Sequence, residues 1–394
     1  MIRATRRQVL LAGMAGIILP GCDYYRVKTK FDLWDNSTGP HLRGACFSQR
    51  RVIPSLDGET FLGAGPVGVP ISDAALARLA ASGANLAVLS HPGIYTETPP
   101  YRYDAPVADH LVDLVDRCER AGLFTVVAFR SGPGRSEFSL QRDDAGSWYP
   151  ESLLNEQVWS SREARQAWMA MWRHTAALLS GKAGVAGYGL MVEPNANQAA
   201  PGAQGQAIDI WDAEALRAEL SGTPGYWPDF ATELAQAIRE IDGDTPILIS
   251  PDGYANAQFA PLLDLQAVPG MVLAIHDYEP RAYTHGDVGD DVFFSPAEAQ
   301  VTPPDATHWM LGEFGVRRYM PGAGGYLDAR LNSLEQSGAA SAYFRWDSGW
   351  DAYEAQENAW NPLYGSDPDA SERSDLTPML SALETAWARN RRRP

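Results

Sequence analysis

Eight short, mostly apolar runs alternate with longer amphipathic stretches, and this alternation most constrains the fold of this chain of 394 residues. The runs are apolar on both faces, which is typical of strands buried in a parallel sheet with helices around it. The segments predicted as strands are 42–47, 85–90, 124–130, 187–193, 246–250, 271–276, 308–313 and 340–346. Helical spacing of apolar residues predicts helices over 73–82, 105–121, 163–179, 229–241, 326–336 and 376–388.

This order of elements predicts an α/β fold, and specifically a (β/α)8 TIM barrel in a single domain. A doubly wound open sheet is the structural alternative, because it uses the same alternation of strand and helix. The barrel is favoured because long polar or aromatic segments follow several of the strands, where the functional loops of barrels gather. The longest of these segments runs over about 194–228.

The N-terminus has the features of an export signal. Arg6 and Arg7 precede an apolar core at 9–19, which is too short to span a bilayer. The arginine pair resembles a twin-arginine signal, and Leu19-Pro20-Gly21-Cys22 resembles a bacterial lipobox. An ordinary cleaved signal with an incidental cysteine is the alternative. The predicted organisation is a signal peptide over 1–21, a lipid anchor and tether over 22–41 that begins at Cys22, and the barrel over 42–394.

Charge and cysteine content exclude several classes of partner. The formal net charge of −17 repels phosphate backbones, so we expect no nucleic-acid partner. Cys46 and Cys118 lie in apolar surroundings, which favours two separate buried thiols over a disulfide between them. The sequence contains no CxxC motif and no Cys/His cluster, so we expect no metal site.

Two glutamates stand at the ends of apolar runs. Glu193 closes 187–193 just before Pro194, and Glu313 closes 308–313 between two glycines. A charge at the end of a hydrophobic strand is costly unless it faces a polar cleft. In a barrel, both side chains are expected at the catalytic mouth, with the nearby second charge and partial burial raising the pKa of Glu193.

The motifs around these glutamates resemble those of glycoside hydrolase family 5, the cellulase-like retaining barrels. The resemblance implies a double displacement in which Glu193 is the acid/base and Glu313 the nucleophile. It also implies that His276 and Tyr278 flank the site and that Trp346 stacks on a sugar face. The segments that carry the resemblance are Arg43-Gly44-Ala45, 80–89, 120–130, 187–194, His276-Asp277-Tyr278, Gly312-Glu313-Phe314-Gly315 and Tyr343-Phe344-Arg345-Trp346.

Three positions depart from the family pattern. Val192 stands where the family has an Asn that binds the sugar 2-hydroxyl, and Val88 stands where it has an Arg that orients the nucleophile. Arg130 stands at the position of a family His. We hypothesise that Arg130 replaces the missing arginine by supplying positive charge near Glu313. Asn195 or Asn197 is then expected to reach the 2-hydroxyl.

The resemblance and the N-terminus together predict an exported, membrane-anchored lipoprotein that faces the periplasm or the cell exterior. Its expected activity is that of a retaining β-glycoside hydrolase on a polysaccharide or oligosaccharide, without a cofactor. The alternatives are a carbohydrate-binding barrel with impaired catalysis, and a glycosidase or transglycosylase of the same clan with another sugar specificity.

Overall fold

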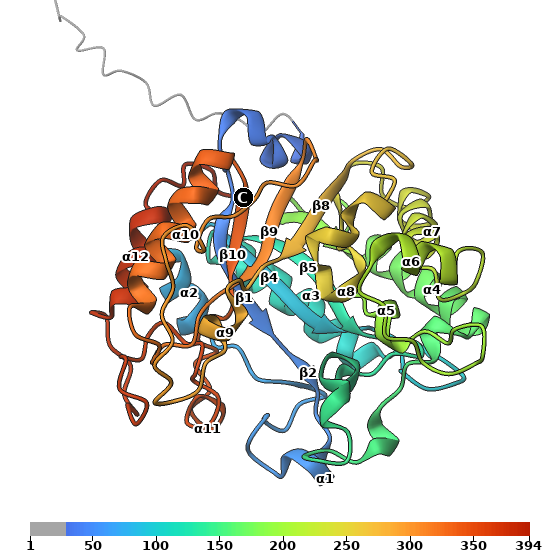
Figure 1. Ribbon diagram of the computed structural model, residues 1–394, viewed down its shortest axis with the longest axis horizontal. Helices are drawn as coiled ribbons and strands as arrows, with labels where there is room; N and C mark the ends of the chain where they lie inside the picture. Colours follow the sequence, from blue (N-terminus) through green and yellow to red (C-terminus); the bar gives the residue numbers. More distant parts are fainter. Residues whose placement is uncertain (1–28) are drawn as a thin grey trace, which may run out of the picture.

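Eight parallel strands close into a barrel in a computed structural model that describes residues 29–394 (Figure 1). The signal segment and Cys22 lie outside the described residues. The strands follow one another around the closed barrel in the order β1-β10-β9-β8-β7-β6-β5-β4, so that, read in the other direction from β1 to β4 and on to β10, they follow their order along the chain. Their bounds are β1 Arg43–Ser48, β4 Leu86–Pro92, β5 Phe124–Ser131, β6 Val185–Gly189, β7 Ile247–Ile249, β8 Met271–His276, β9 Trp309–Phe314 and β10 Ala340–Tyr343. The predicted TIM barrel is confirmed, and the open sheet is excluded.

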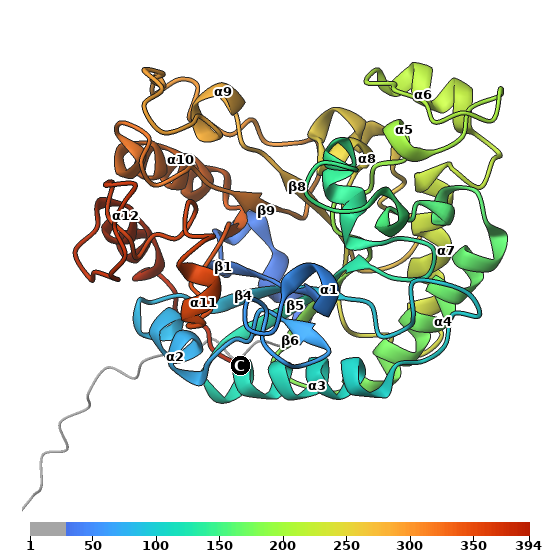
Figure 2. The ribbon, with the colours of Figure 1, turned by 90° about the horizontal axis from the view of Figure 1, so that it is seen from below.

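Helices surround the strands, as the amphipathic stretches predicted (Figure 2). The longer ones are α2 Asp73–Ala81, α3 Ala105–Arg120, α4 Arg162–Leu179, α7 Trp227–Arg239, α10 Ala323–Ser337 and α12 Pro378–Trp387. Shorter elements lie in the connections: β2 Arg50–Arg51, α1 Pro54–Asp57, β3 Val67–Gly68, α5 Ala196–Ala199, α6 Ala213–Leu220, α8 Asp252–Ala255, α9 Arg281–Thr284 and α11 Asp351–Glu354. Six 3₁₀ segments complete the description: Lys30–Trp34, Asn36–Thr38, Glu137–Asp144, Glu151–Leu153, Gln157–Trp159 and Ala257–Leu262. None of the helices from residue 29 onward has the length and apolar character of a membrane span.

Short polar side chains begin several of the long helices. Ser72 accepts a hydrogen bond from the Ala75 amide at the start of α2, and Ser161 accepts one from the Ala164 amide at the start of α4. Such caps satisfy amide groups that have no partner within the helix. They fix where each helix leaves its loop, and therefore where the loops of the barrel mouth return to the body.

The core consists of two layers that follow the period-two alternation of the strands. One layer packs between the barrel and the helices. The other fills the barrel interior with small and medium side chains, among them Cys46, Val88, Val126 and Ala274. Cys46 and Cys118 are both buried and unpaired, which confirms the prediction of two separate thiols.

Part of the predicted tether over 22–41 is folded instead against the end of the barrel opposite the strand C-termini, which corrects the prediction. Leu33 and Trp34 belong to the interior cluster and are only 2% and 1% exposed. The Trp34 indole donates to the Ala186 carbonyl (3.0 Å), and the Asn36 amide donates to the carbonyls of Trp309 and Gly338 (both 3.0 Å). This segment is folded because its apolar side chains close the bottom of the barrel, so the folded body begins before residue 42.

Candidate active site

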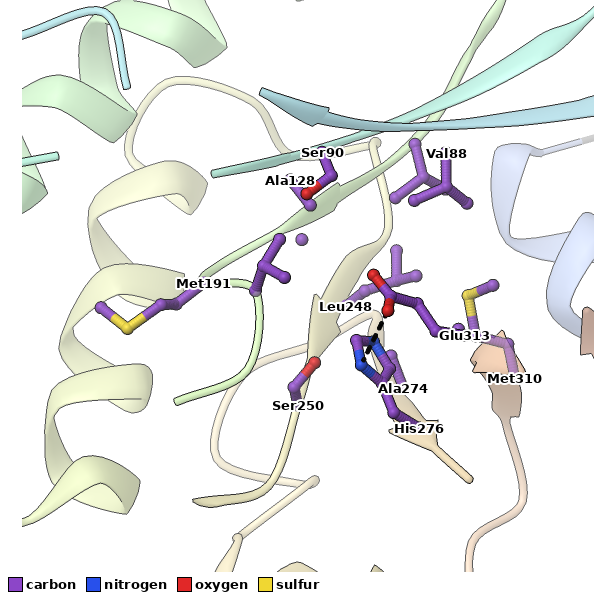
Figure 3. Close-up of a pocket in the computed structure, with 14 residues that line it drawn as sticks. Val88, Ser90, Ala128, Met191, Leu248, Ser250, Ala274, His276, Met310 and Glu313 are labelled. Atoms are coloured by element: carbon purple, nitrogen blue, oxygen red, sulfur yellow. Dashed lines mark ion pairs between the residues drawn. The ribbon is translucent and has the colours of Figure 1, made fainter. Parts of the chain in front are cut away.

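A pocket extends from the barrel interior to the C-terminal ends of the strands, and Glu313 and His276 point toward each other within it (Figure 3). Glu313 is the fifth residue of β9 and is 6% exposed, and His276 is the last residue of β8. Most of the remaining wall is apolar. It is formed by Val88, Val126, Ala128, Gly189, Met191, Val192, Leu248, Ala274, Met310 and Gly312, with the hydroxyl groups of Ser90 and Ser250.

The two predicted catalytic glutamates come together at His276. The Nδ1 atom of His276 lies 2.9 Å from Glu193 Oε1 and 3.6 Å from Glu313 Oε2. One carboxylate oxygen of each glutamate and a His276 ring nitrogen all lie within 4.8 Å of one another. Tyr278, which the family resemblance implies flanks the site, donates its hydroxyl to Glu313 Oε2 at 3.0 Å. Glu193, Glu313 and His276 together offer oxygen and nitrogen ligands to a cation, and of these atoms His276 Nδ1 is hydrogen-bonded to Glu193 and Glu313 Oε2 to Tyr278.

Glu193 reaches the pocket from a bent loop rather than from a strand, which corrects the predicted strand over 187–193. β6 ends at Gly189, and Glu193 has a left-handed backbone with φ of 48°. A residue with a Cβ adopts this conformation only when its surroundings enforce it. Arg135, which is 0% exposed, donates to the carbonyl oxygens of Val192 (2.9 Å) and Glu193 (2.8 Å). No sequence pattern indicates this positioning residue, because a long-range hydrogen bond to a backbone carbonyl leaves no motif.

The pKa values of the two glutamates also differ from the prediction. Burial alone would raise the pKa of Glu193, but the hydrogen bond and charge of His276, with Arg130 and Arg135, hold that pKa below its usual range. Burial and the nearby charge of Glu193 instead raise the pKa of Glu313, against the opposing charge of His276. The expected elevation therefore falls on Glu313, because His276 hydrogen-bonds the other carboxylate.

Arg130 lies near the glutamates but does not hydrogen-bond either of them. Its guanidinium forms a two-pronged ion pair with Glu137 (2.6 and 2.9 Å) and also contacts the hydroxyl groups of Ser48 and Ser90. Ser48 ends β1 and Ser90 lies on β4, so the side chain reaches from β5 across the neighbouring strand. Burial disfavours the cation, but Glu137, and more weakly Glu313 and Glu193, raise the pKa of Arg130. Its influence on the site is therefore electrostatic.

Two expected substrate contacts are wrong. Asn195 is 0% exposed; its amide donates to the Ser139 carbonyl (3.0 Å) and its oxygen accepts from Trp159 (3.2 Å). Asn197 is fully buried as well. Neither side chain faces solvent, because the loop after β6 turns back into the body.

Trp346 is likewise unavailable to a sugar. Its indole is 1% exposed, donates to the Ala75 carbonyl (3.2 Å) and packs against Trp387. Ala342 belongs to the interior cluster and Phe344 packs against it, but β10 ends at Tyr343 and the alternation does not continue to Trp346, which lies in the layer outside the barrel. Counting by twos from Ala342 leads to both Phe344 and Trp346, so the sequence pattern alone could not separate the two rings.

Comparisons with known proteins place the fold. The cellulase model of glycosyl hydrolase family 5 matches residues 62–349, whereas no curated protein matches the sequence. The Pseudomonas stutzeri endoglucanase Cel5A superposes with a TM-score of 0.57 at 18% identity, over 90% of this chain and 96% of that one. Thermotoga maritima Cel5A in complex with mannotriose gives 0.57 at 15% identity, over 90% and 99%. With its barrel, its paired glutamates and a family match over most of its length, the chain belongs to glycosyl hydrolase family 5.

Proposed function

We propose that this glycoside hydrolase cleaves a β-glycosidic bond with retention of configuration, with Glu313 as nucleophile and Glu193 as acid/base. The observation that carries the proposal is the close approach of the two carboxylates, whose nearest oxygens are within 4.8 Å of each other. Retaining enzymes hold their carboxyl groups about 5–5.5 Å apart, whereas inverting enzymes leave room for a water molecule between them. Tyr278 holds one oxygen of Glu313, which leaves the other for attack on the anomeric carbon.

In this mechanism His276 links the protonation of Glu193 to the charge of Glu313. When Glu313 attacks, one of its oxygens bonds to the anomeric carbon as the glycosidic bond breaks. The negative charge leaves on the departing oxygen, which takes a proton from Glu193. His276 lies within reach of both carboxylates and can donate to either one. Loss of the Glu313 charge weakens the reason for His276 to remain protonated, so the two events are electrostatically linked.

Azide rescue tests the two assignments separately. With a dinitrophenyl β-glycoside, Glu193→Ala should accumulate the glycosyl-enzyme, and azide should restore turnover with a β-glycosyl azide as product. Glu313→Ala should be inactive on the same substrate, with any azide product having the α configuration. A fluorinated mechanism-based sugar should label Glu313 in the native protein. Substantial turnover by Glu313→Ala, or an inverted product from the native enzyme, would overturn the proposal, and binding without turnover would favour the impaired carbohydrate-binding alternative.

The apolar wall supports a second candidate for the substrate. Val88 and Val192 line the pocket beside Glu313 and offer no hydrogen bond to a sugar hydroxyl. A buried hydroxyl without a partner is costly, so this wall favours a sugar whose hydroxyl next to the reacting carbon is absent or substituted. Comparing the turnover of aryl glycosides with and without a free 2-hydroxyl decides between such a sugar and one that carries this hydroxyl. The matched structures include complexes with mannotriose and cellobiose, so β-linked mannosides and glucosides form the reference set.

We also propose that the enzyme is exported and anchored to a membrane by lipid on Cys22. The support is the sequence alone, because these residues lie outside the described part of the chain. Cys22→Ala should move the protein from the membrane fraction to the soluble fraction, and mass spectrometry of the native N-terminus should find a diacylglyceryl cysteine. A Cys22→Ala protein that stays in the membrane fraction would contradict the lipid anchor.

A further inference from the structure

The end of the barrel opposite the catalytic mouth holds the beginning of the described chain beside residues 389–393. Figure 1 places both at the end opposite α1 and β2. The Arg392 guanidinium donates to the backbone carbonyl of Asp32 at 2.8 Å. Arg393 donates to the carbonyl of Gly122 (3.3 Å), in the loop that leads into β5. These bonds hold the segment against the bottom of the barrel, at the N-terminal ends of the strands.

This segment is strongly basic in a chain whose formal net charge is −17. It contains no acid and four arginines, which are Arg389, Arg391, Arg392 and Arg393. Arg391 and Arg393 are exposed, and within residues 29–394 their guanidinium groups form no ion pair and bond only to backbone carbonyls. Their charge is therefore available to a partner outside the chain.

Acidic side chains offset only part of the positive charge at this end. Glu335 lies 3.5 Å from the Arg389 guanidinium. Asp32 and Asp35 lie close enough to Arg392 to act on its charge. The two exposed arginines without an ion pair, together with their half-buried neighbour, leave a cluster of cations on an otherwise acidic molecule. Arg391, Arg392 and Arg393 are called the basic face below.

The proposed lipid site lies close to this face along the chain. Cys22 precedes Thr29, the first described residue, by seven residues, and a chain of that length spans at most about 25 Å. The Thr29 amide donates to the Asp32 carboxylate (2.9 Å), and the carbonyl of Asp32 accepts from Arg392. A lipid on Cys22 therefore keeps the bottom of the barrel near the bilayer surface.

We propose that the basic face docks on anionic phospholipid headgroups, so that the catalytic mouth points away from the membrane. This docking rests on the proposed lipid anchor, which supplies the affinity that three arginines lack. Guanidinium groups bind phosphate oxygens with two parallel hydrogen bonds. The acidic remainder of the molecule is repelled by the same surface, which strengthens the orientation. The pocket then faces the side on which a polysaccharide can approach.

Partition of a singly acylated protein measures the attraction. Residues 22–394 are coupled through Cys22 to one myristoyl-length chain, which by itself gives only reversible membrane binding. On phosphatidylglycerol vesicles at about 0.1 M salt, Arg391→Gln/Arg393→Gln should bind about tenfold more weakly than the parent. Arg391→Lys/Arg393→Lys, which keeps the charge, should bind like the parent.

Arg102→Gln/Arg281→Gln is the matched control for this partition. It removes the same charge from two exposed arginines that follow β4 and β8 at the mouth. Because charges beyond the screening length of about 10 Å contribute little, it should change the affinity by less than about twofold. A variant with glutamine at 391 and 393 that binds as tightly as the parent would overturn the proposal.

Chemical footprinting tests the orientation without any substitution. Phenylglyoxal modifies accessible guanidinium groups, and mass spectrometry follows each arginine separately. In the coupled protein, Arg391 and Arg393 should react several times more slowly on phosphatidylglycerol than on phosphatidylcholine vesicles, whereas Arg102 and Arg281 should react equally on both. Equal rates for all four would overturn the proposal even if the native Cys22 carries lipid. Conversely, protected arginines in the coupled protein and no lipid on the native one would refute the anchor while the basic face stands.

Discussion

His276 determines how negative charge is divided between the two glutamates. It hydrogen-bonds Glu193 and lies slightly farther from Glu313, so the pKa values of the two carboxyl groups move in opposite directions. Such a split is how two chemically identical side chains take different roles. In the resting structure Glu193 is the better stabilised anion. The bound sugar and the departing charge of Glu313 must therefore change this balance before Glu193 can act as an acid.

The charge of His276 should appear in the pH dependence of stability. Burial disfavours the imidazolium, but Glu313 and Glu193 raise the pKa of His276 above its usual 6.5. A raised folded pKa stabilises the protein below the unfolded pKa, and this contribution is lost as pH rises through the folded value. In urea unfolding, the stability lost in His276→Gln should be largest between about pH 4.5 and 6.5 and should shrink above that window.

His285 supplies the control for this pH dependence. Its burial lowers its pKa to about 4, so the unfolded state binds the proton more readily. The stability cost of His285 appears as pH falls below about 6.5, which is the opposite trend. If the stability change caused by His285→Gln followed the same pH trend as that of His276→Gln, the assigned charge of His276 would be contradicted.

Arg130 should affect turnover through charge alone. Arg130→Met should lower kcat by about tenfold or more, because it removes a buried positive charge that interacts with both glutamates. Glu137→Gln is the control, since it breaks the ion pair while keeping the Arg130 charge. Steady-state kinetics on an aryl β-glycoside measures both. Near-normal turnover by Arg130→Met would remove the role.

At the scale of the elements, the point at which β10 ends decides which aromatic ring faces the barrel interior. Ala342 and Phe344 turn toward the barrel interior, whereas Trp346, beyond the strand, packs on Trp387 of α12. Trp346→Ala should therefore destabilise the protein by about 3–5 kcal/mol, the usual cost of emptying a buried tryptophan site. Chemical denaturation measures this, and Trp148→Ala, whose ring is 43% exposed, should change stability by less than about 1 kcal/mol. Weakened sugar binding by Trp346→Ala with unchanged stability would instead restore the stacking role.

For the whole molecule, the barrel is stabilised without a covalent link between its described cysteines. Cys46 lies inside the barrel and Cys118 in the layer outside it, and both are 0% exposed. Burial raises the pKa of Cys118 to about 12, so its reactive thiolate is scarce at neutral pH. In a Cys22→Ala protein, a thiol reagent should find no reactive group until unfolding, and a reductant should leave the melting temperature unchanged. Rapid labelling of native protein would contradict this.

The sequence by itself determined the order of strands and helices, the barrel and the two glutamates. These follow from local features: apolar runs of strand length, helical periodicity, and polar residues at strand ends that only a cleft can accommodate. The companions His276 and Tyr278 were implied by the resemblance of their motif to family 5. Tertiary structure alone decided which side chains share that cleft. It withdrew Asn195 and Trp346, brought in Arg135, and added Trp34 to the bottom of the barrel. The physical reason is that the direction in which a side chain points depends on where its strand ends, and its contacts depend on segments far apart in the sequence. A local sequence pattern contains neither.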